Sequence, residues 1–310
     1  MVKVRRNDIK LEALHDWEKD GDYIIFGEFQ HQLFVKQFGN SKARSAKTLL
    51  LIHGFPESSF SYHSVIEGLL ETFDRIVLFD MIGYGFSEKP IKNYSYSLLK
   101  QADSAFAVWE HFGVKGGHIL AHDMGNSVAT EILARQNENS LPRSFSDGIL
   151  SMTFTNGSIV LEMAKLRITQ KILLTKLGPL LSKLTTFSLF NHQVRSAHGN
   201  ENLTMENIQS LWQLNTLNNG HKKTYLTIKY LNDRKKFEKS RWIPAVQKTE
   251  IPVHFCWGKD DAVARVEMAH FLKNEVCPEA TLTIMEDVGH FAQMDNPSKW
   301  IKSVTNFYKD

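Results

Sequence analysis

Cysteine is scarce in this chain of 310 residues, which contains only Cys256 and Cys277. Two cysteines provide no disulfide framework, and such low use is typical of a protein that folds in a reducing compartment. Long apolar runs are also missing, because no stretch approaches the roughly 20 residues needed to cross a bilayer. The N-terminus, residues 1–10, is charged and lacks the apolar core of a signal peptide. We therefore expect a cytoplasmic protein without a transmembrane segment.

A strong bias in charge is absent as well. Lys and Arg number 37 against 34 Asp and Glu, and the net charge of +3 is too small to predict a nucleic-acid partner. An apolar content of 42% and a charged content of 23% are ordinary for a soluble globular protein. The composition does not specify an oligomeric state. The length suits one large domain with an inserted subdomain.

Strand and helix patterns alternate along most of the chain. A predicted strand pair, 23–28 and 31–37, comes first. Further strands are predicted at 48–52, 75–79, 118–121, 149–155, 253–257 and 281–285. Helical patterns occupy 64–70, 97–112 and 126–136. This alternation predicts an α/β fold with a mostly parallel, eight-stranded sheet covered by helices on both sides. In such sheets, chemistry takes place at the carboxyl ends of the strands.

One block interrupts the alternation, because only helical patterns occur between residues 157 and 244. We predict a core formed by 1–156 and 245–310, with 157–244 inserted after the sixth strand as a helical cap over the site. The alternative is that these helices pack behind the sheet. Within the block, residues 171–190 are rich in leucine but interrupted by lysines, Gly178 and Pro179. We interpret this stretch as an amphipathic packing segment rather than a membrane-surface segment.

Residues 116–130 have the pattern of a nucleophile elbow between a strand and a helix. The turn reads Ala121-His122-Asp123-Met124-Gly125. Small residues are needed on both sides of such a turn, and the nucleophile at its centre would be Asp123. The serine pattern G-x-S-x-G occurs nowhere in the chain, and Ser127 lies one turn into the following helix. A serine esterase or peptidase is therefore disfavoured.

Two loops after strands flank the elbow in the predicted sheet. His53-Gly54-Phe55-Pro56 follows strand 48–52. Oxyanion holes of this kind take one N–H from this loop and one from the residue after the nucleophile, which predicts the amides of Phe55 and Met124. The glycine-containing loop 79–87 lacks the third glycine of a phosphate-binding motif. We interpret it as a structural loop that Asp80 supports.

The last two strand ends carry an acid and a histidine. Trp257-Gly258-Lys259-Asp260-Asp261 follows one strand, and Val288-Gly289-His290-Phe291 follows the next. Nucleophile, acid, histidine is the chain order of triads on elbow-containing α/β sheets. We favour Asp261 over Asp260 because it lies three residues after Gly258. The sequence therefore predicts a triad of Asp123, Asp261 and His290.

These motifs together resemble the α/β-hydrolase superfamily, in its epoxide hydrolase and haloalkane dehalogenase branch, over nearly the whole chain. The resemblance rests on H-G-F-P at 53–56, G-Y-G-F-S at 83–87, H-D-M-G at 122–125, G-K-D-D at 258–261 and G-H-F at 289–291. The segment 230–237 with Arg241-Trp242 is also similar to the cap of mesoderm-specific transcript proteins. The resemblance implies an α/β-hydrolase fold and an aspartate nucleophile, with no metal or cofactor.

An aspartate nucleophile predicts a particular reaction. A carboxylate is ionised at pH 7, so Asp123 would attack an electrophilic sp³ carbon and form an ester. His290, oriented by Asp261, would then activate water to hydrolyse that ester. The partners expected are a small, apolar, electrophilic substrate and water, with epoxides, alkyl halides and strained lactones as candidates. A non-catalytic ligand-binding role is the alternative from another class.

The residues that receive the leaving atom distinguish these substrates. Halide-releasing relatives carry a tryptophan after the nucleophile, whereas Met124 and Phe55 offer no side-chain N–H, so epoxide opening is favoured over haloalkane dehalogenation. Epoxide hydrolases donate a proton from cap tyrosines. Tyr225 and Tyr230, five residues apart on one presumed helix, would diverge by more than about 100°, and we favour Tyr230. The other candidate substrate-binding residues are His53, Trp109, Trp212 and Tyr225.

Overall fold

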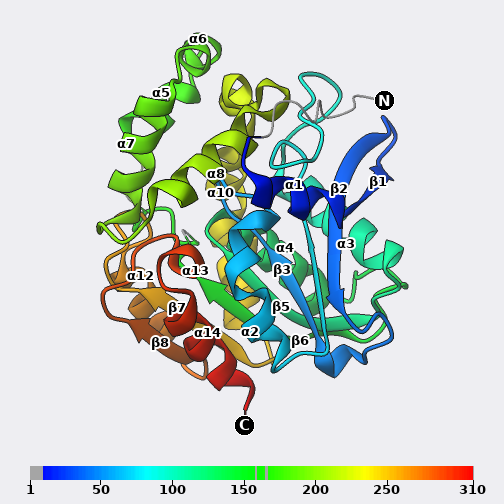
Figure 1. Cartoon of the computed structure of the whole chain (residues 1–310). Coiled ribbons are helices and arrows are strands. Elements are labelled where there is room, and N and C mark those ends of the chain that lie inside the picture. The colour runs from blue at the N-terminus through cyan, green and yellow to red at the C-terminus, as the bar shows by residue number, and fades with distance from the viewer. Residues whose placement is uncertain (1–9, 158, 165–166, 310) are drawn as a thin grey trace.

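A computed structural model describes residues 10–157, 159–164 and 167–309. The first nine residues of the charged N-terminal segment lie outside that description. Eight strands form one sheet in the order β1-β2-β4-β3-β5-β6-β7-β8 (Figure 1). Their bounds are β1 Asp22–Phe26, β2 His31–Gly39, β3 Thr48–Ile52, β4 Arg75–Phe79, β5 Gly116–His122, β6 Gly148–Thr155, β7 Val253–Gly258 and β8 Thr281–Met285.

In the sheet order, the strands from β4 to β8 are parallel, and within the described sheet only β2 runs the other way. β1 pairs antiparallel with β2, and β2 pairs antiparallel with β4. The remaining pairs are parallel. The predicted α/β fold with a mostly parallel, eight-stranded sheet is confirmed. The carboxyl ends of β3, β5, β6, β7 and β8 therefore meet at one edge of the sheet.

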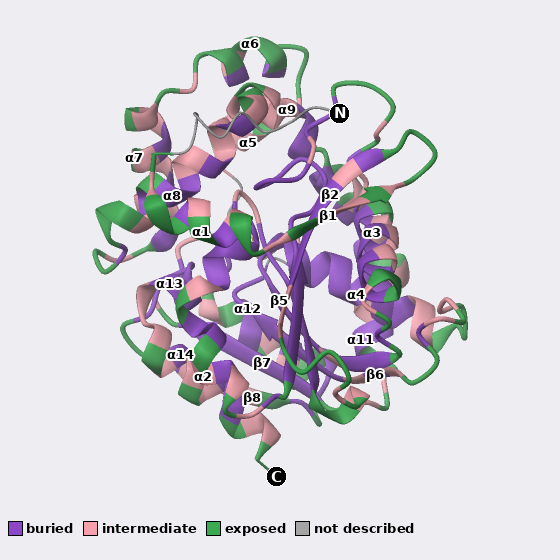
Figure 2. Ribbon diagram, turned by 45° about the vertical axis from the view of Figure 1, so that its right-hand side comes forward, coloured by how far each residue is buried: buried purple, intermediate pink, exposed green. Residues whose placement is uncertain are grey.

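Both faces of the sheet are covered, and β3, β4 and β7 are buried at every position. Leu50 and Ile52 of β3 pack in one cluster with residues of α3, α4, α11 and α12. Leu49 and Leu51 point to the opposite face and pack with residues of α1, α2 and α14. Figure 2 shows the buried strands between helices whose outer surfaces are exposed. These helices are α1 Glu12–Lys19, α2 Ile66–Leu70, α3 Leu98–His111, α4 Met124–Asn137, α11 Ile243–Gln247, α12 Val266–Phe271 and α14 Pro297–Thr305. A short α13, Ala292–Asp295, follows β8.

Between β6 and β7 the described residues form helices and turns but no strand. Besides α11, which packs on the core, these helices are α5 Ile168–Leu173, α6 Gly178–Lys183, α7 Phe187–His198, α8 Met205–Thr216, α9 Thr224–Thr227 and α10 Tyr230–Phe237. Figure 1 shows α5, α6 and α7 grouped at one end of the molecule, beyond the sheet.

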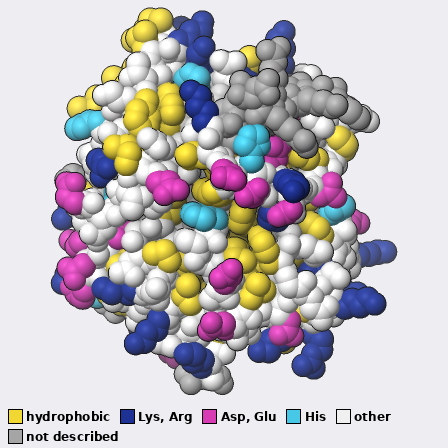
Figure 3. Space-filling model, in the orientation of Figure 1, with side chains coloured by type: hydrophobic (Ala, Val, Ile, Leu, Met, Phe, Trp, Pro, Cys, Tyr) yellow, Lys and Arg dark blue, Asp and Glu magenta, His cyan; other side chains and the backbone are white. Residues whose placement is uncertain are grey.

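The leucine-rich segment 171–190 packs less completely than the amphipathic pattern predicts. Leu173 packs against the core, but Leu177, Leu180 and Leu184 are exposed around α6. Hydrophobic side chains are visible at that end of the molecule in Figure 3, where acidic and basic side chains are otherwise interspersed. Within the described part of the chain, no helix is both long and apolar enough to cross a membrane.

Candidate active site

Asp123 occupies the sharp turn between β5 and α4. Its backbone is in the left-handed region, with φ 45° and ψ −113°, a conformation that non-glycine residues adopt only when their surroundings enforce it. The enforcement comes from close packing on both sides. A Cβ on Gly125 would lie 2.6 Å from the carbonyl oxygens of Ile52 and His53. A Cβ on Gly54 would lie 2.7 Å from the Cβ of Asp123.

A backbone amide contacts the Asp123 carboxylate, and a second lies next to it in the chain. The N–H of Phe55 donates a hydrogen bond of 2.9 Å to its Oδ2 atom. Met124 is the first residue of α4, so its N–H has no acceptor within the helix. The positive end of the helix dipole also lies at this point and favours a negative charge. The structure thus gathers the two predicted oxyanion amides at the elbow.

His290 stands next to Asp123 on the loop after β8. Its Nε2 atom lies 4.0 Å from Oδ1 of Asp123, and its Nδ1 atom lies 2.8 Å from Oδ2 of Asp261. The other oxygen of Asp261 accepts the N–H groups of Val263 and Ala264 at 2.7 and 2.8 Å. All three members of the predicted triad are at least nine-tenths buried. The structure therefore brings Asp123, His290 and Asp261 together.

Asp260 points elsewhere. Its carboxylate accepts a hydrogen bond of 3.3 Å from the side chain of Asn200. Of the two neighbouring acids, only Asp261 bonds to His290 in the described structure.

The acids around His290 set its charge. Burial disfavours the imidazolium, but the charge and hydrogen bond of Asp261 outweigh it, together with the charges of Asp123 and Glu57. They raise the pKa of His290 to about 9. His290 is therefore protonated at neutral pH while the Asp123 carboxylate is free.

Asn156, which sequence reasoning missed, holds the acid in place. Its side-chain N–H donates to Oδ2 of Asp261 at 2.8 Å, and its Oδ1 accepts the N–H of Gly258 at 3.0 Å. The residue has a positive φ of 42° directly after β6. An asparagine at a strand end was the only signal in the sequence, and many such residues simply form turns.

The sequence patterns also did not reveal the buried pair of Glu57 and His122 next to Asp123. His122 lies 2.6 Å from the carboxylate of Glu57 through Nδ1 and donates from Nε2 to the carbonyl of His290 at 2.8 Å. Glu57 also accepts hydrogen bonds from the N–H of Gly54 and the side chain of Gln293. Although burial raises the pKa of Glu57, the charge and hydrogen bond of His122 outweigh it together with the charges of His290 and His53, and the net pKa is lowered. The pair links the H-G-F-P loop, the elbow and the His290 loop.

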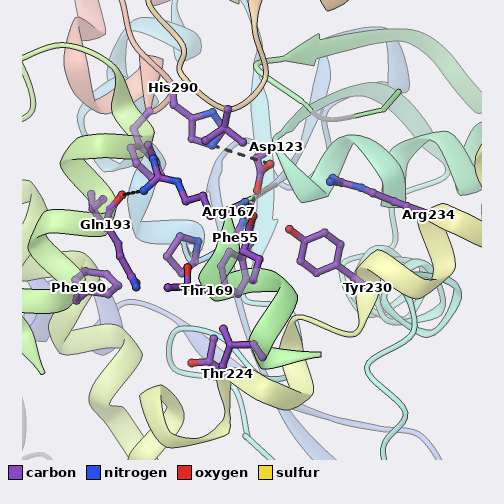
Figure 4. A pocket seen from close by; sticks show the side chains of 17 residues that line it. Phe55, Asp123, Arg167, Thr169, Phe190, Gln193, Thr224, Tyr230, Arg234 and His290 are labelled. Atoms are coloured by element: carbon purple, nitrogen blue, oxygen red, sulfur yellow. Dashed lines mark hydrogen bonds and ion pairs between the residues drawn. The ribbon is translucent and has the colours of Figure 1, made fainter. Parts of the chain in front are cut away.

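A cavity of about 110 Å³ opens above Asp123 and His290 (Figure 4). The core contributes Phe55, Pro56, Val263 and Phe291 to its lining. The segment between β6 and β7 contributes Arg167, Thr169, Gln170, Leu173, Phe190, Gln193, Val194, Ala197, Thr224, Tyr230 and Arg234. Most of the wall thus comes from the predicted cap region. The two arginines received no role from the sequence.

Only one of Tyr225 and Tyr230 lines the cavity, as expected, but the two do not diverge around a single helix. The prediction that they share one helix is wrong, since α9 ends at Thr227 and α10 begins at Tyr230. Tyr230 lines the cavity, with its ring 5.8 Å from that of Phe55. Burial raises its pKa above the ordinary value, so the phenol keeps its proton. Tyr225 does not line the cavity, and its backbone N–H bonds to Ser182 next to α6.

Three other candidate substrate-binding residues lie away from the cavity. Trp109 is buried in the core, with its ring stacked 4.8 Å from that of Phe145. The ring of Trp212 packs with its centre 5.2 Å from that of Phe190, a lining residue, but Trp212 itself does not line the cavity. His53 accepts the N–H of Met81 through Nε2. These positions correct the sequence-based assignment: the described lining of the cavity contains no tryptophan.

The glycine-containing loop 79–87 has the structural role predicted for it. Asp80 accepts the N–H of Ser59 at 2.6 Å and that of Phe86 at 2.7 Å. Both of its oxygens are thus occupied in fixing the loop beside the elbow.

Comparison with known proteins agrees with this geometry. Residues 47–297 match the family model described as the alpha/beta hydrolase fold. The protein LipZ of Mycobacterium tuberculosis is 35% identical over 276 residues, covering 89% of this chain and 93% of its own. The human mesoderm-specific transcript homolog protein is 30% identical over 301 residues, covering 95% of this chain and 88% of its own. The solved structure of the epoxide hydrolase CorEH superposes with a TM-score of 0.70 at 18% identity, over 93% of this chain and 98% of that one. The chain therefore belongs to the α/β-hydrolase fold family.

Proposed function

We propose that this protein is a hydrolase in which Asp123 forms a covalent ester with the substrate, and that epoxides are its substrate class. The observation that carries the proposal is a carboxylate at the elbow, held by the Phe55 amide and faced by the His290–Asp261 pair. A carboxylate needs no base to become a nucleophile, whereas the ester that it forms needs one to be hydrolysed. The positions of Asp123 and His290 support both parts of this proposal.

The first step is an attack by Asp123 on a ring carbon. Because Oδ2 accepts the Phe55 N–H, the free Oδ1 is the attacking atom. The carbon–oxygen bond of the epoxide breaks as the ester bond forms, and the electron pair stays on the leaving oxygen. Tyr230, a buried and neutral phenol that lines the cavity, donates its proton to that oxygen.

The second step is hydrolysis of the ester. A gap of 4.0 Å between His290 and Asp123 leaves room for water to be oriented near the base. His290, which is protonated before the ester forms, first gives its proton to the Tyr230 phenolate. As a neutral base it then takes a proton from the water, whose oxygen attacks the ester carbonyl. The oxyanion that forms accepts hydrogen bonds from the Phe55 and Met124 amides. The ester bond then breaks, the departing oxygen takes the remaining proton of the water, and the diol leaves with the Asp123 carboxylate and protonated His290 restored.

Epoxides are preferred to haloalkanes because of the groups available for the leaving atom. Halide-releasing relatives hold the departing halide with a tryptophan N–H directly after the nucleophile, and neither Met124 nor Phe55 has a side-chain N–H. The described cavity lining has no tryptophan but does contain Tyr230, whose phenol suits a departing alkoxide. Haloalkane dehalogenation and strained-lactone hydrolysis use the same ester and are the alternatives within this mechanism. We also propose that residues 157–244 form the cap, because they supply most of the cavity wall.

Intact-mass spectrometry of a His290→Ala variant tests the proposal. After exposure to panels of epoxides, haloalkanes and lactones, we expect a stable adduct with the mass of one epoxide, located on Asp123 by peptide mapping. The double variant that also carries Asp123→Asn is the matched control and should remain unmodified. Absence of any adduct, combined with no turnover by the wild type, would favour a ligand-binding protein. Faster halide release than epoxide opening would instead favour a dehalogenase.

A further inference from the structure

Arg234 is a buried cation with an unused donor. The residue lies on α10 and is only 1% exposed. Its Nε atom donates to the hydroxyl of Ser127 at 2.9 Å, and its guanidinium lies 4.8 Å from the centre of the Tyr230 ring. The Nη2 atom is buried and has no hydrogen-bond partner among the described residues. Buried polar groups are nearly always hydrogen-bonded, so an unpaired guanidinium donor points to a missing ligand.

The cavity lining supplies one carboxylate for this cation, and Glu238, which interacts with Arg234 through its charge, forms no ion pair with it within the described residues. Asp123 is the only carboxylate among the described lining residues, whereas two arginines, Arg167 and Arg234, belong to the lining. Neither arginine forms an ion pair within the described part of the chain. Arg135 and Arg241, in contrast, each bind two carboxylates. With His290 protonated at neutral pH, the lining carries an excess of positive charge.

The two arginines differ in where their donors point. Arg167 donates to the carbonyl of Gln193 at 3.0 Å and to the hydroxyl of Ser196 at 3.1 Å. Figure 4 shows the guanidinium of Arg167 directed toward Gln193, whereas that of Arg234 points toward Asp123 from the other side. Arg234 is therefore the one placed to reach a bound molecule at the nucleophile.

The hydrogen bond from Arg234 to Ser127 determines which part of a bound substrate the guanidinium can contact. Ser127 follows Asp123 by one turn of α4, so the guanidinium lies beside the nucleophile. In a displacement, the leaving atom departs on the side of the carbon opposite the attacking oxygen. A group at the flank of Asp123 therefore contacts a substituent of the attacked carbon rather than the leaving atom.

We propose that the substrate carries a carboxylate next to the reacting carbon, and that Arg234 binds it. A guanidinium presents parallel N–H donors that match the two oxygens of a carboxylate. The substrate class becomes epoxy acids, in place of the neutral, apolar electrophiles expected from the sequence. This inference rests on the proposed ester-forming reaction, whose substrate it narrows.

A matched pair of substrates tests the inference. Oxirane-2-carboxylate and its neutral amide share the reactive ring and differ in charge. We expect the wild type to favour the acid in kcat/KM, and Arg234→Gln to lose that preference by about 10- to 100-fold, as for a charge-assisted hydrogen bond. Arg195→Gln, which removes the same charge from α7 outside the cavity lining, is the control and should keep the preference. An equal loss for acid and amide in Arg234→Gln would overturn the inference.

Binding measurements separate this inference from the reaction itself. In an Asp123→Asn background, calorimetry with propionate, propionamide and inorganic phosphate probes the site without chemistry. We expect propionate to bind and Arg234→Gln to abolish that binding, with the thermal unfolding midpoint as the check on folding. Propionate binding without any Asp123 adduct in the mass experiment would refute the ester mechanism but keep the anion site. An adduct accompanied by no propionate binding, or by binding of phosphate or propionamide instead, would refute the anion site.

Discussion

The charge of Asp123 should control the pKa of His290. Two unit charges about 4 Å apart interact by about 4 kcal/mol at an effective dielectric constant of ~20. The Nε2–Oδ1 distance of 4.0 Å matches that case. Since one pKa unit corresponds to about 1.4 kcal/mol, Asp123→Asn should lower the pKa of His290 by up to about 3 units. The starting value is about 9.

Esterification of Asp123 removes the same negative charge as the Asn substitution. In the proposed reaction, His290 is protonated in the free protein at pH 7 and becomes a neutral base only after the ester forms. The two steps therefore depend on pH differently. Ester formation proceeds with His290 protonated, whereas ester hydrolysis speeds up as the pH rises through the lowered pKa of His290. His290 would thus be a neutral base during ester hydrolysis, the step that requires one.

An NMR titration of the histidine ring carbons measures this pKa directly. Comparison with His290→Ala assigns the resonance among the 13 histidines. The same titration in Asp123→Asn gives the shift, and Asp260→Asn, which removes a neighbouring acid that bonds to Asn200 instead, is the control. An unchanged pKa in Asp123→Asn would refute the coupling and with it the proposed timing of proton transfer.

Three further predictions concern single positions. Tyr230→Phe should slow epoxide opening by about 10²-fold or more, because it removes the proton donor, while alkylation by haloalkanes changes little; single-turnover kinetics with both substrates checks this. Asn156→Ala should slow ester hydrolysis more than ester formation, since Asn156 holds Asp261, and a longer-lived adduct in time-resolved mass spectra would reveal it. Gly125→Ala should destabilise the fold by about 1–3 kcal/mol, because its Cβ would overlap two carbonyl oxygens; urea unfolding measures the loss, and an unchanged midpoint would contradict the packing argument.

The core and its triad were predictable because local pattern and topology agree there. Apolar runs such as Thr48–Ile52 are long enough to read as buried strands, and each is followed by a polar loop. Parallel strands bring those loops to one edge, so residues far apart in sequence meet. Asp123 and His290, 167 positions apart, needed no contact information beyond the strand ends that carry them.

The cavity wall was harder to predict because helical patterns show which faces are apolar but not what they face. Arg234 stands in the run Asn232-Asp233-Arg234-Lys235-Lys236, which resembles an exposed charged face. In the structure, Arg234 is buried while its neighbours Lys235 and Lys236 are exposed. The tyrosines were misjudged for a related reason, since the turn between α9 and α10 contains no glycine or proline to mark it.

The proposed cap also contacts the His290 loop through the backbone. The carbonyl of His198, at the end of α7, accepts the N–H of His290 at 2.8 Å, and the His198 ring accepts the N–H of Phe291 at 3.2 Å. A Cβ on Gly289 would lie 2.5 Å from that same carbonyl, so the contact admits only glycine there. The orientation of the base therefore depends on where α7 ends. A substitution in the proposed cap that shifts the end of α7 would therefore also shift His290. We expect such a substitution to change the rate of ester hydrolysis together with the substrate preference.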